Sequence, residues 1–166
     1  MAIMSKTTAA YMAGIVDGEG TITIIKCWNK KNQKSYFGVY LNISNTNKNL
    51  INWLKKSFGG YIYKIKVPNP KPNWNDIYRW QIYRQSNLIK ILEKIKPYLK
   101  IKKRHAEIVL EFIKLFDSKF FLYERYKNGQ IKKRIVDNEI EKKRDILYQE
   151  LKKLNFRGKI ICTLND

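Results

Sequence analysis

The chain has 166 residues, with 34 lysines and arginines against 14 aspartates and glutamates, which gives a formal net charge of +20. Hydrophobic residues make up 44% of it, which excludes a disordered basic tail, and its length predicts a single domain over residues 1–166. It has no uncharged apolar run of about 18 residues, no apolar leader and only two cysteines, so we expect no transmembrane helix and an intracellular location. That location is the cytoplasm or nucleoid of a prokaryote, or an organelle.

The alternation of side chains and the positions of glycine and proline predict nine elements. In chain order these are a helix over 8–17, strands over 21–24 and 36–45, a helix capped by Asn47 that ends at Gly59, strands over 61–67 and 77–84, a helix capped by Asn87 that ends before Pro97, and helices over 103–116 and 137–154. Each strand has one apolar and one polar face. We therefore expect an α+β fold in which helices cover one face of a four-stranded antiparallel sheet and leave the other face open.

The net charge predicts a polyanionic partner, because each neutralised phosphate releases condensed counterions. On charge alone, nucleic acid is the first candidate and an anionic membrane the second, and we expect nucleic acid and no membrane as the partner. A lysine-rich surface that merely reflects AT-rich codons is the alternative, since Lys, Ile and Asn make up 65 of the 166 residues.

The first helix ends in two acids that are flanked by glycines. Asp17 and Glu19 lie at the C-terminal end of this helix, which is the unfavourable end for negative charge, so a functional reason for them is favoured. A carboxylate and a free glycine carbonyl can bind a hard cation such as Mg²⁺. The alternative is a glycine-rich turn with two solvated acids. Ala10 and Gly14 lie one turn apart, a spacing that lets two helix backbones approach closely.

Residues 12–20, Met-Ala-Gly-Ile-Val-Asp-Gly-Glu-Gly, resemble the nine-residue motif of the LAGLIDADG homing endonucleases. Met replaces the first Leu of that motif, Gly18 replaces its second Ala, and Glu19 replaces its second Asp. The αββαββα order, Gly-Gly-Tyr at 59–61, Tyr-Arg-Trp-Gln-Ile at 78–82 and Pro-Tyr-Leu-Lys-Ile-Lys-Lys-Arg at 97–104 also fit, so the resemblance extends over about residues 8–155.

The motif occurs only once in the sequence, so the resemblance implies a homodimer. The two motif helices would pack at the two-fold axis through Ala10, Ala13, Gly14 and Asp17. Such a dimer would cut both strands of a long pseudo-palindromic DNA site and leave short 3′ overhangs, in the manner of an intron- or intein-encoded enzyme.

The resemblance also implies catalytic residues. Glu19 and the carbonyl of Gly18 would hold Mg²⁺, for which Mn²⁺ or Ca²⁺ can substitute in binding. Lys102, with Lys100 as the alternative, corresponds to a lysine near the scissile phosphate. Asn45 stands where relatives often have a glutamine that positions water, although a turn leading into the next helix explains it equally well.

DNA readers are expected on the open sheet face, where amides pair with adenine, arginine with guanine and threonine methyls with thymine. A bulge in the first strand would turn two further side chains toward DNA. The candidates are Thr21, Thr23, Lys26, Trp28, Tyr40, Asn42, Ser44, Tyr63, Arg79, Gln81 and Tyr83.

Two other functions compete with the endonuclease. One is a maturase of the same family that binds its host intron RNA, and the other is a catalytically silent DNA-binding protein. Retention of Glu19 favours the nuclease, because binding RNA does not require that acid.

Overall fold

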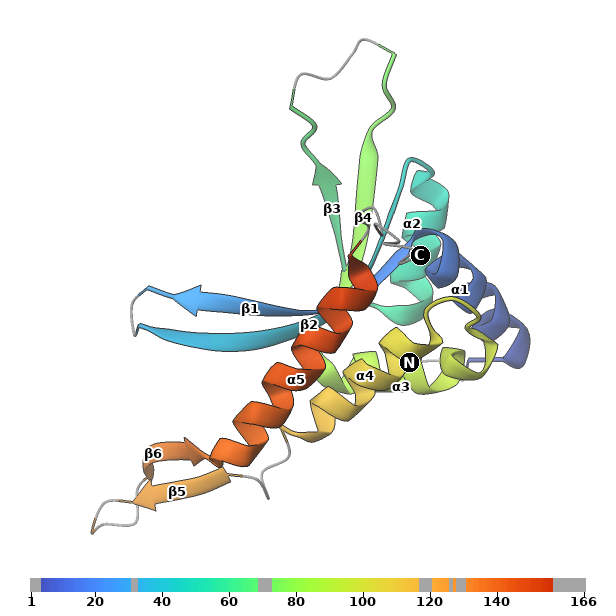
Figure 1. Ribbon diagram of the computed structural model, residues 1–166. Coiled ribbons are helices and arrows are strands. Elements are labelled where there is room, and N and C mark those ends of the chain that lie inside the picture. Colours follow the sequence, from blue (N-terminus) through green and yellow to red (C-terminus); the bar gives the residue numbers. More distant parts are fainter. Residues whose placement is uncertain are drawn as a thin grey trace, which may run out of the picture.

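A computed structural model of the chain (Figure 1) describes residues 4–30, 33–68, 73–116, 121–125, 127 and 131–156. Its elements are α1 (Lys6–Glu19), β1 (Gly20–Asn29), β2 (Lys34–Asn45), α2 (Lys48–Phe58), β3 (Tyr61–Ile65), β4 (Ile77–Ile82), α3 (Gln85–Ile95), a short 3₁₀ turn η1 (Lys96–Tyr98), α4 (Lys103–Lys114), β5 (Phe121–Arg125), β6 (Ile131–Val136) and α5 (Asn138–Asn155). None of the helices in these ranges combines the length and apolar composition that a bilayer crossing requires.

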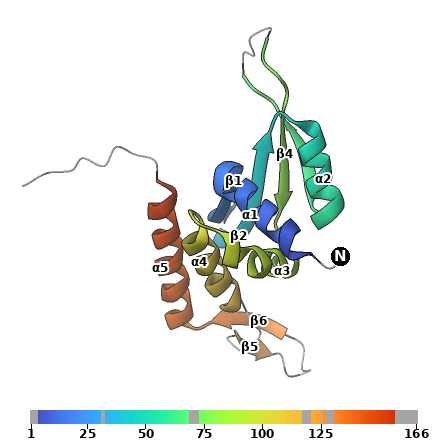
Figure 2. The ribbon, with the colours of Figure 1, turned by 90° about the vertical axis from the view of Figure 1, so that its right-hand side faces the viewer.

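The main sheet is antiparallel, with strand order β1-β2-β4-β3. Alternate residues of its strands, such as Ile22, Leu41 and Trp80, are fully buried against the helices. The β1–β2 and β3–β4 pairs extend outward in different directions, whereas α5 runs along α4 (Figures 1 and 2). The α+β fold with helices on one sheet face is confirmed.

Side-chain caps explain where several helices begin. The Asn47 side chain accepts hydrogen bonds from the amides of Asn49 and Leu50, as predicted, and Asp137 does the same for Glu139 at the start of α5. The prediction that Asn87 caps α3 is wrong. That helix begins at Gln85 with Arg84 as its N-cap, three residues before the predicted cap, and no side chain caps it.

Several boundaries differ from the prediction. Helix α1 continues to Glu19 and β1 reaches Asn29, whereas β3 and β4 each end two residues earlier than predicted. A two-stranded sheet of β5 and β6 lies between α4 and α5 and was not predicted. Its strands pair only with each other, so the alternation that a half-buried strand of the main sheet displays is not required of them.

Candidate active site and nucleic-acid interface

Glu19 is the last residue of α1, and its side chain is exposed. The chain passes directly from Glu19 into β1 because Gly20 lies against the last turn of the helix. A Cβ added at Gly20 would lie 2.7 Å from the Val16 carbonyl oxygen and 2.8 Å from the Val16 Cα. Only glycine fits this close approach, which therefore fixes where Glu19 stands relative to the sheet.

Asp17 faces the loop that precedes α4. Its two carboxylate oxygens accept hydrogen bonds from the backbone amides of Lys100, at 2.7 Å, and Lys102, at 2.9 Å. Partial burial raises the pKa of Asp17, but hydrogen bonds from three successive amides of the loop and the Lys102 charge outweigh it, so the pKa lies below its ordinary value. Asp17 is therefore a structural anion.

Lys102 contacts the same helix end from the other direction. Its ammonium donates to the backbone carbonyls of Val16, at 3.0 Å, and Asp17, at 2.5 Å. A cation at this position is favourable because the last carbonyls of a helix carry partial negative charge. The predicted catalytic lysine thus contacts the end of α1. One of the carbonyls that it binds belongs to Asp17, two residues before Glu19.

His105 lies behind this contact and is 9% exposed. Burial and the neighbouring Lys102 charge lower its pKa, against weaker raising effects from a hydrogen bond to the backbone of Leu154 and from Asp17. Its Nδ1 has no hydrogen-bond partner within the part of the chain that the structure describes. A neutral histidine therefore joins the end of α5 to the site.

Asn45 is part of the turn before α2. Its side-chain oxygen accepts the amide of Asn47 at 2.7 Å, which is the turn interaction that the sequence offered as an alternative. Its position in β2 pairs with Tyr78, on the helix-covered side of the sheet.

Strand registers place most of the predicted DNA readers on one face. Thr21 pairs with Asn42 and Asn42 with Gln81, and a neighbouring row joins Ser44 to Arg79 and Arg79 to Tyr63. Thr23 and Tyr40 form a further row of this open face. Asn42 is only 8% exposed, so its neighbours cover most of it. Tyr83 follows the end of β4 and is exposed.

Lys26 and Trp28 do not lie on the open face. The β1–β2 register is unbroken from Gly20 to Asn29, so no bulge turns them. Because side chains of a strand alternate between its faces, Lys26 lies on the same face as the buried Ile22 and Ile24. Its ammonium lies 2.8 Å from the Asp145 carboxylate of α5 and over the Phe37 ring. The predicted bulge is absent, and with it the predicted placement of Lys26 and Trp28, because the two adjacent isoleucines, Ile24 and Ile25, lie on opposite faces of a continuous strand.

Two aromatic residues of this face were not predicted as DNA readers. Tyr61 is about half exposed and stacks on Tyr83, with ring centroids 5.1 Å apart and planes 12° apart. Tyr36, also about half exposed, pairs in register with Cys27. Their spacing of two and four residues from Tyr63 and Tyr40 is the sequence signal that could have identified them.

One stripe of α1 is exposed. Ala10 and Gly14 belong to it, and a Cβ added at Gly14 would meet nothing within 4 Å. Tyr11 borders the stripe and packs edge-on against Trp53 of α2. Ala13, predicted at the dimer interface, is instead fully buried in the core, because it belongs to the core-facing side of α1 together with Ala9, Met12 and Val16. The Asp17 carboxylate is engaged within its own chain, as described above.

The metal donors of one chain are few. Among the residues that the structure describes, no three His, Cys, Asp or Glu side chains come together as a metal site. Asp17 is committed to backbone amides, which leaves Glu19 as the exposed carboxylate at the end of α1. Mg²⁺ is commonly bound through one or two carboxylates while water and substrate phosphate complete its shell, so the chemistry of a single exposed carboxylate such as Glu19 suits this ion.

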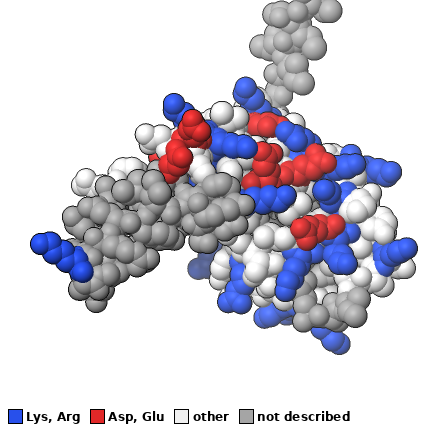
Figure 3. All heavy atoms as spheres, turned by 90° about the horizontal axis from the view of Figure 1, so that it is seen from below, with Lys and Arg blue, Asp and Glu red and all other residues white. Residues whose placement is uncertain are grey.

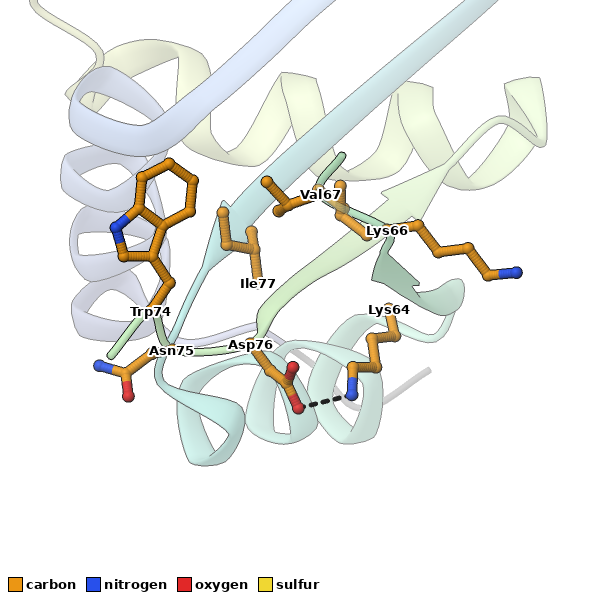
Figure 4. Close-up of a pocket in the computed structure, with 8 residues that line it drawn as sticks. Lys64, Lys66, Val67, Trp74, Asn75, Asp76 and Ile77 are labelled. Carbon is orange, nitrogen blue, oxygen red and sulfur yellow. Dashed lines mark ion pairs between the residues drawn. The ribbon is translucent and has the colours of Figure 1, made fainter. Parts of the chain in front are cut away.

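The β3–β4 loop forms a hollow of about 360 Å³ at the far end of the sheet (Figure 4). Lys64 and Asp76 form an ion pair of 2.6 Å across its mouth, and the exposed Trp74 lies on the opposite wall. Lys66 also lines the hollow and adds positive charge to this end of the sheet, whereas Asp76 offsets the charge of Lys64.

Acidic side chains gather elsewhere. Seen from below, they lie among basic ones (Figure 3), and the ion pairs of α4 and α5 include Arg104 with Glu150, at 2.6 Å, and Lys143 with Glu111, at 3.7 Å. The helical side therefore neutralises much of its own charge.

Comparisons with known proteins agree on the architecture. No family model and no curated protein matches the chain. Among solved structures, it is similar to the homing endonuclease I-CvuI bound to its target, with a TM-score of 0.67, 21% identity, and coverage of 93% of this chain and 85% of that one. It is also similar to the archaeal intron-encoded I-Vdi141I bound to DNA, with a TM-score of 0.66, 18% identity and coverage of 92% and 86%.

A third similar structure is the LAGLIDADG homing endonuclease I-SmaMI bound to cleaved DNA, with a TM-score of 0.59 and 14% identity. The match covers 92% of this chain but only 45% of that one. In all three matches the coverage of this chain includes nearly all its described elements. The chain therefore has the fold of the LAGLIDADG homing endonucleases.

Proposed function

We propose that the protein is a site-specific DNA endonuclease that works as a homodimer and depends on a divalent metal. One observation carries this proposal. An exposed carboxylate, Glu19, is fixed at the point where α1 meets the open polar face of a basic sheet. An acid at that position repels DNA phosphate unless a cation lies between them, so a binding surface without chemistry gains nothing from it.

Glu19 and the carbonyl of Gly18 are the groups that would hold the metal. When bound, a divalent cation neutralises the phosphate and activates a water for attack. The chain's own contribution is to orient the carboxylate and to direct the phosphodiester toward it. The open face reads base edges, and lysines at the sheet ends bind the backbone.

Three observations support the dimer. The exposed stripe of α1 around Ala10 and Gly14 has small side chains that let a second helix approach, and the described residues of one chain supply a single exposed carboxylate at the end of α1. This chain also spans most of I-CvuI and I-Vdi141I but under half of I-SmaMI. A two-fold pair would bring two Glu19 side chains to one DNA duplex.

The test begins by finding a target. A dimer reads both halves of its site alike, so a plasmid library with inverted repeats of randomised half-sites, each about 10 base pairs, samples the palindromic targets it prefers. Binders are selected in Ca²⁺, since I-SmaMI was crystallised with uncleaved DNA in that ion. The selected plasmid is then incubated with wild type and with Glu19→Gln in Mg²⁺ and in Mn²⁺.

We expect the wild type to linearise the plasmid and Glu19→Gln to bind it without cutting. Binding without cleavage by both proteins, in both metals, would contradict the nuclease and leave a DNA-binding protein. Addition of structured RNA as a competitor separates the maturase, because preferential binding of RNA would also contradict the proposal.

A further inference from the structure

We infer that Asp17 is a positioning residue for Glu19, acting through a reciprocal lock with Lys102. In this lock the acid of α1 binds the backbone of the loop at 100–102, and the lysine of that loop binds the backbone of α1. The inference rests on the proposed function, because the positioned group is the proposed metal ligand.

The first half of the lock begins α4. Lys102 is the N-cap residue of that helix, and its own side chain makes no capping hydrogen bond. The carboxylate of Asp17, 85 residues earlier in the chain, accepts the Lys102 amide at 2.9 Å and the Lys100 amide at 2.7 Å. An anion beside amides at a helix start is stabilised by them, so α4 is tied to the end of α1.

The second half of the lock ends α1. The Lys102 ammonium lies within 3.0 Å of the Val16 and Asp17 carbonyl oxygens. The Val16 carbonyl also accepts the amide of Gly20, the residue that begins β1. Hydrogen bonds from α4 and from β1 thus meet at one carbonyl of the last turn, and Glu19 lies between the two points where that turn is held.

Glu19 itself has no such support. In the described part of the chain, no hydrogen bond or ion pair joins its carboxylate to another residue, and Gly18 before it has open space around its Cα. Its orientation therefore depends on the backbone of the last turn. A shift of about 1 Å in a reacting group costs on the order of 10²-fold in rate, so the Asp17 carboxylate, which binds only backbone amides, can still control cleavage.

Asp137 provides a matched control. It is the N-cap residue of α5 and its carboxylate, like that of Asp17, accepts an amide at a helix start, that of Glu139 at 2.9 Å. Asparagine caps a helix about as well as aspartate, so Asp137→Asn keeps the single acceptor oxygen that α5 uses and should lose little stability. Asp17→Asn removes one of the two acceptor oxygens that the Lys100 and Lys102 amides use, so only this variant breaks the lock, although both variants remove a negative charge at a helix start.

The experiment compares wild type, Asp17→Asn and Asp137→Asn on the selected target plasmid, well below their unfolding temperatures. DNA affinity is measured in Ca²⁺, the single-turnover cleavage rate in Mg²⁺, and amide hydrogen exchange of residues 14–20 without metal or DNA. For Asp17→Asn we expect a rate loss on the order of 10²-fold at an affinity within about twofold of wild type, and faster exchange in 14–20. Asp137→Asn should match wild type in all three.

Each outcome is decisive. An unchanged rate for Asp17→Asn, or a rate loss matched by an equal loss of affinity, would overturn the lock while leaving the proposed endonuclease intact. No cleavage by the wild type would overturn both. If Asp17→Asn does not fold, Asp17→Glu, which keeps both acceptor oxygens on a longer arm, should show a smaller rate loss at unchanged affinity, and an unchanged rate would again overturn the inference.

Discussion

The sheet and the C-terminal helices use charge in opposite ways. Residues 1–102, from α1 to the loop before α4, contain 18 lysines and arginines against 4 acids, whereas residues 103–166 contain 16 against 10. The net charges are thus +14 and +6. Two of the four acids in the first region, Asp17 and Asp76, already have partners within the chain.

In the second region, acids of α4 and α5 form ion pairs with Arg104 and Lys143. A further acid, Asp145 of α5, pairs with Lys26 of β1. These pairs hold α5 to α4 and to β1. The comparison indicates that residues 1–102 carry most of the net positive charge, which favours a polyanionic partner, while acids of α4 and α5 form ion pairs within the chain.

The largest effect on activity is expected from blocking the exposed stripe of α1, which belongs to the first of the two regions. Gly14→Leu places a large side chain where the monomer has open space, and Leu is better than Gly in a helix by about 0.8–1 kcal/mol. The monomer should become more stable, yet the dimer and cleavage should be lost. Light scattering with gel filtration measures the loss of the dimer, and plasmid linearisation measures the loss of cleavage.

Gln149→Leu on α5, also at an exposed helical position, is the control and should remain dimeric and active. A dimeric, active Gly14→Leu variant would show that the subunits meet elsewhere.

The next effect tests the charge comparison directly. Arg79 is exposed on the open face, and its Nε donates to Ser44 Oγ at 3.1 Å. Arg79→Met should weaken DNA binding by about 1–3 kcal/mol and relax preference at one base pair. Lys143→Met, which removes a cation that pairs with Glu111, should change affinity little. Binding titrations at several salt concentrations measure both, and equal losses would contradict the division of charge between the two regions.

A smaller effect links the two regions through pH. The pKa of His105 is lowered by burial and by Lys102, so the unfolded chain, near the ordinary 6.5, binds its proton more readily than the folded one. Stability should be complete above about 6.5 and fall as pH decreases toward the folded pKa. His105→Gln should flatten this fall. Urea unfolding of both proteins between pH 7.5 and 5.5, about one unit either side of the ordinary histidine pKa, measures this decrease in stability. An identical fall in the variant would show that other groups cause it.

The smallest effect concerns the brace between α5 and β1. Asp145→Asn removes the partner of Lys26, and because both side chains are substantially exposed the loss of stability should be about 0.2–1 kcal/mol. Glu93→Gln on α3, an exposed acid with no ion pair in the described ranges, is the control and should lose less. Chemical denaturation distinguishes them. An equal or larger loss in the control would show that the Lys26–Asp145 ion pair does not contribute measurably to stability.

Periodicity predicted most of the fold because each half-buried element displays its environment along the chain. Val39, Leu41 and Ile43 alternate with polar residues, and all three are buried. The β5–β6 pair escaped prediction because neither strand joins the main sheet. Asn87 was misread because Asn also occurs inside helices when packing fixes the start.

Errors at the site have a common cause, since the sequence does not say what stands opposite a side chain. Ala13 and Ala10 are chemically alike, but one packs into the core and the other is exposed. Lys26 was assigned to the DNA face, yet the acid that binds it, Asp145, lies 119 residues later.

The sequence by itself determined the α+β order, the acidic end of the first helix and the excess of positive charge, because these depend on local spacing and composition. Only the tertiary structure decided the roles of the two acids. Asp17 meets the amides of Lys100 and Lys102 and is committed to the fold, whereas Glu19 remains exposed. The physical reason is that backbone amides carry no sequence signature, so a carboxylate that they satisfy looks the same in the sequence as one held ready for a metal.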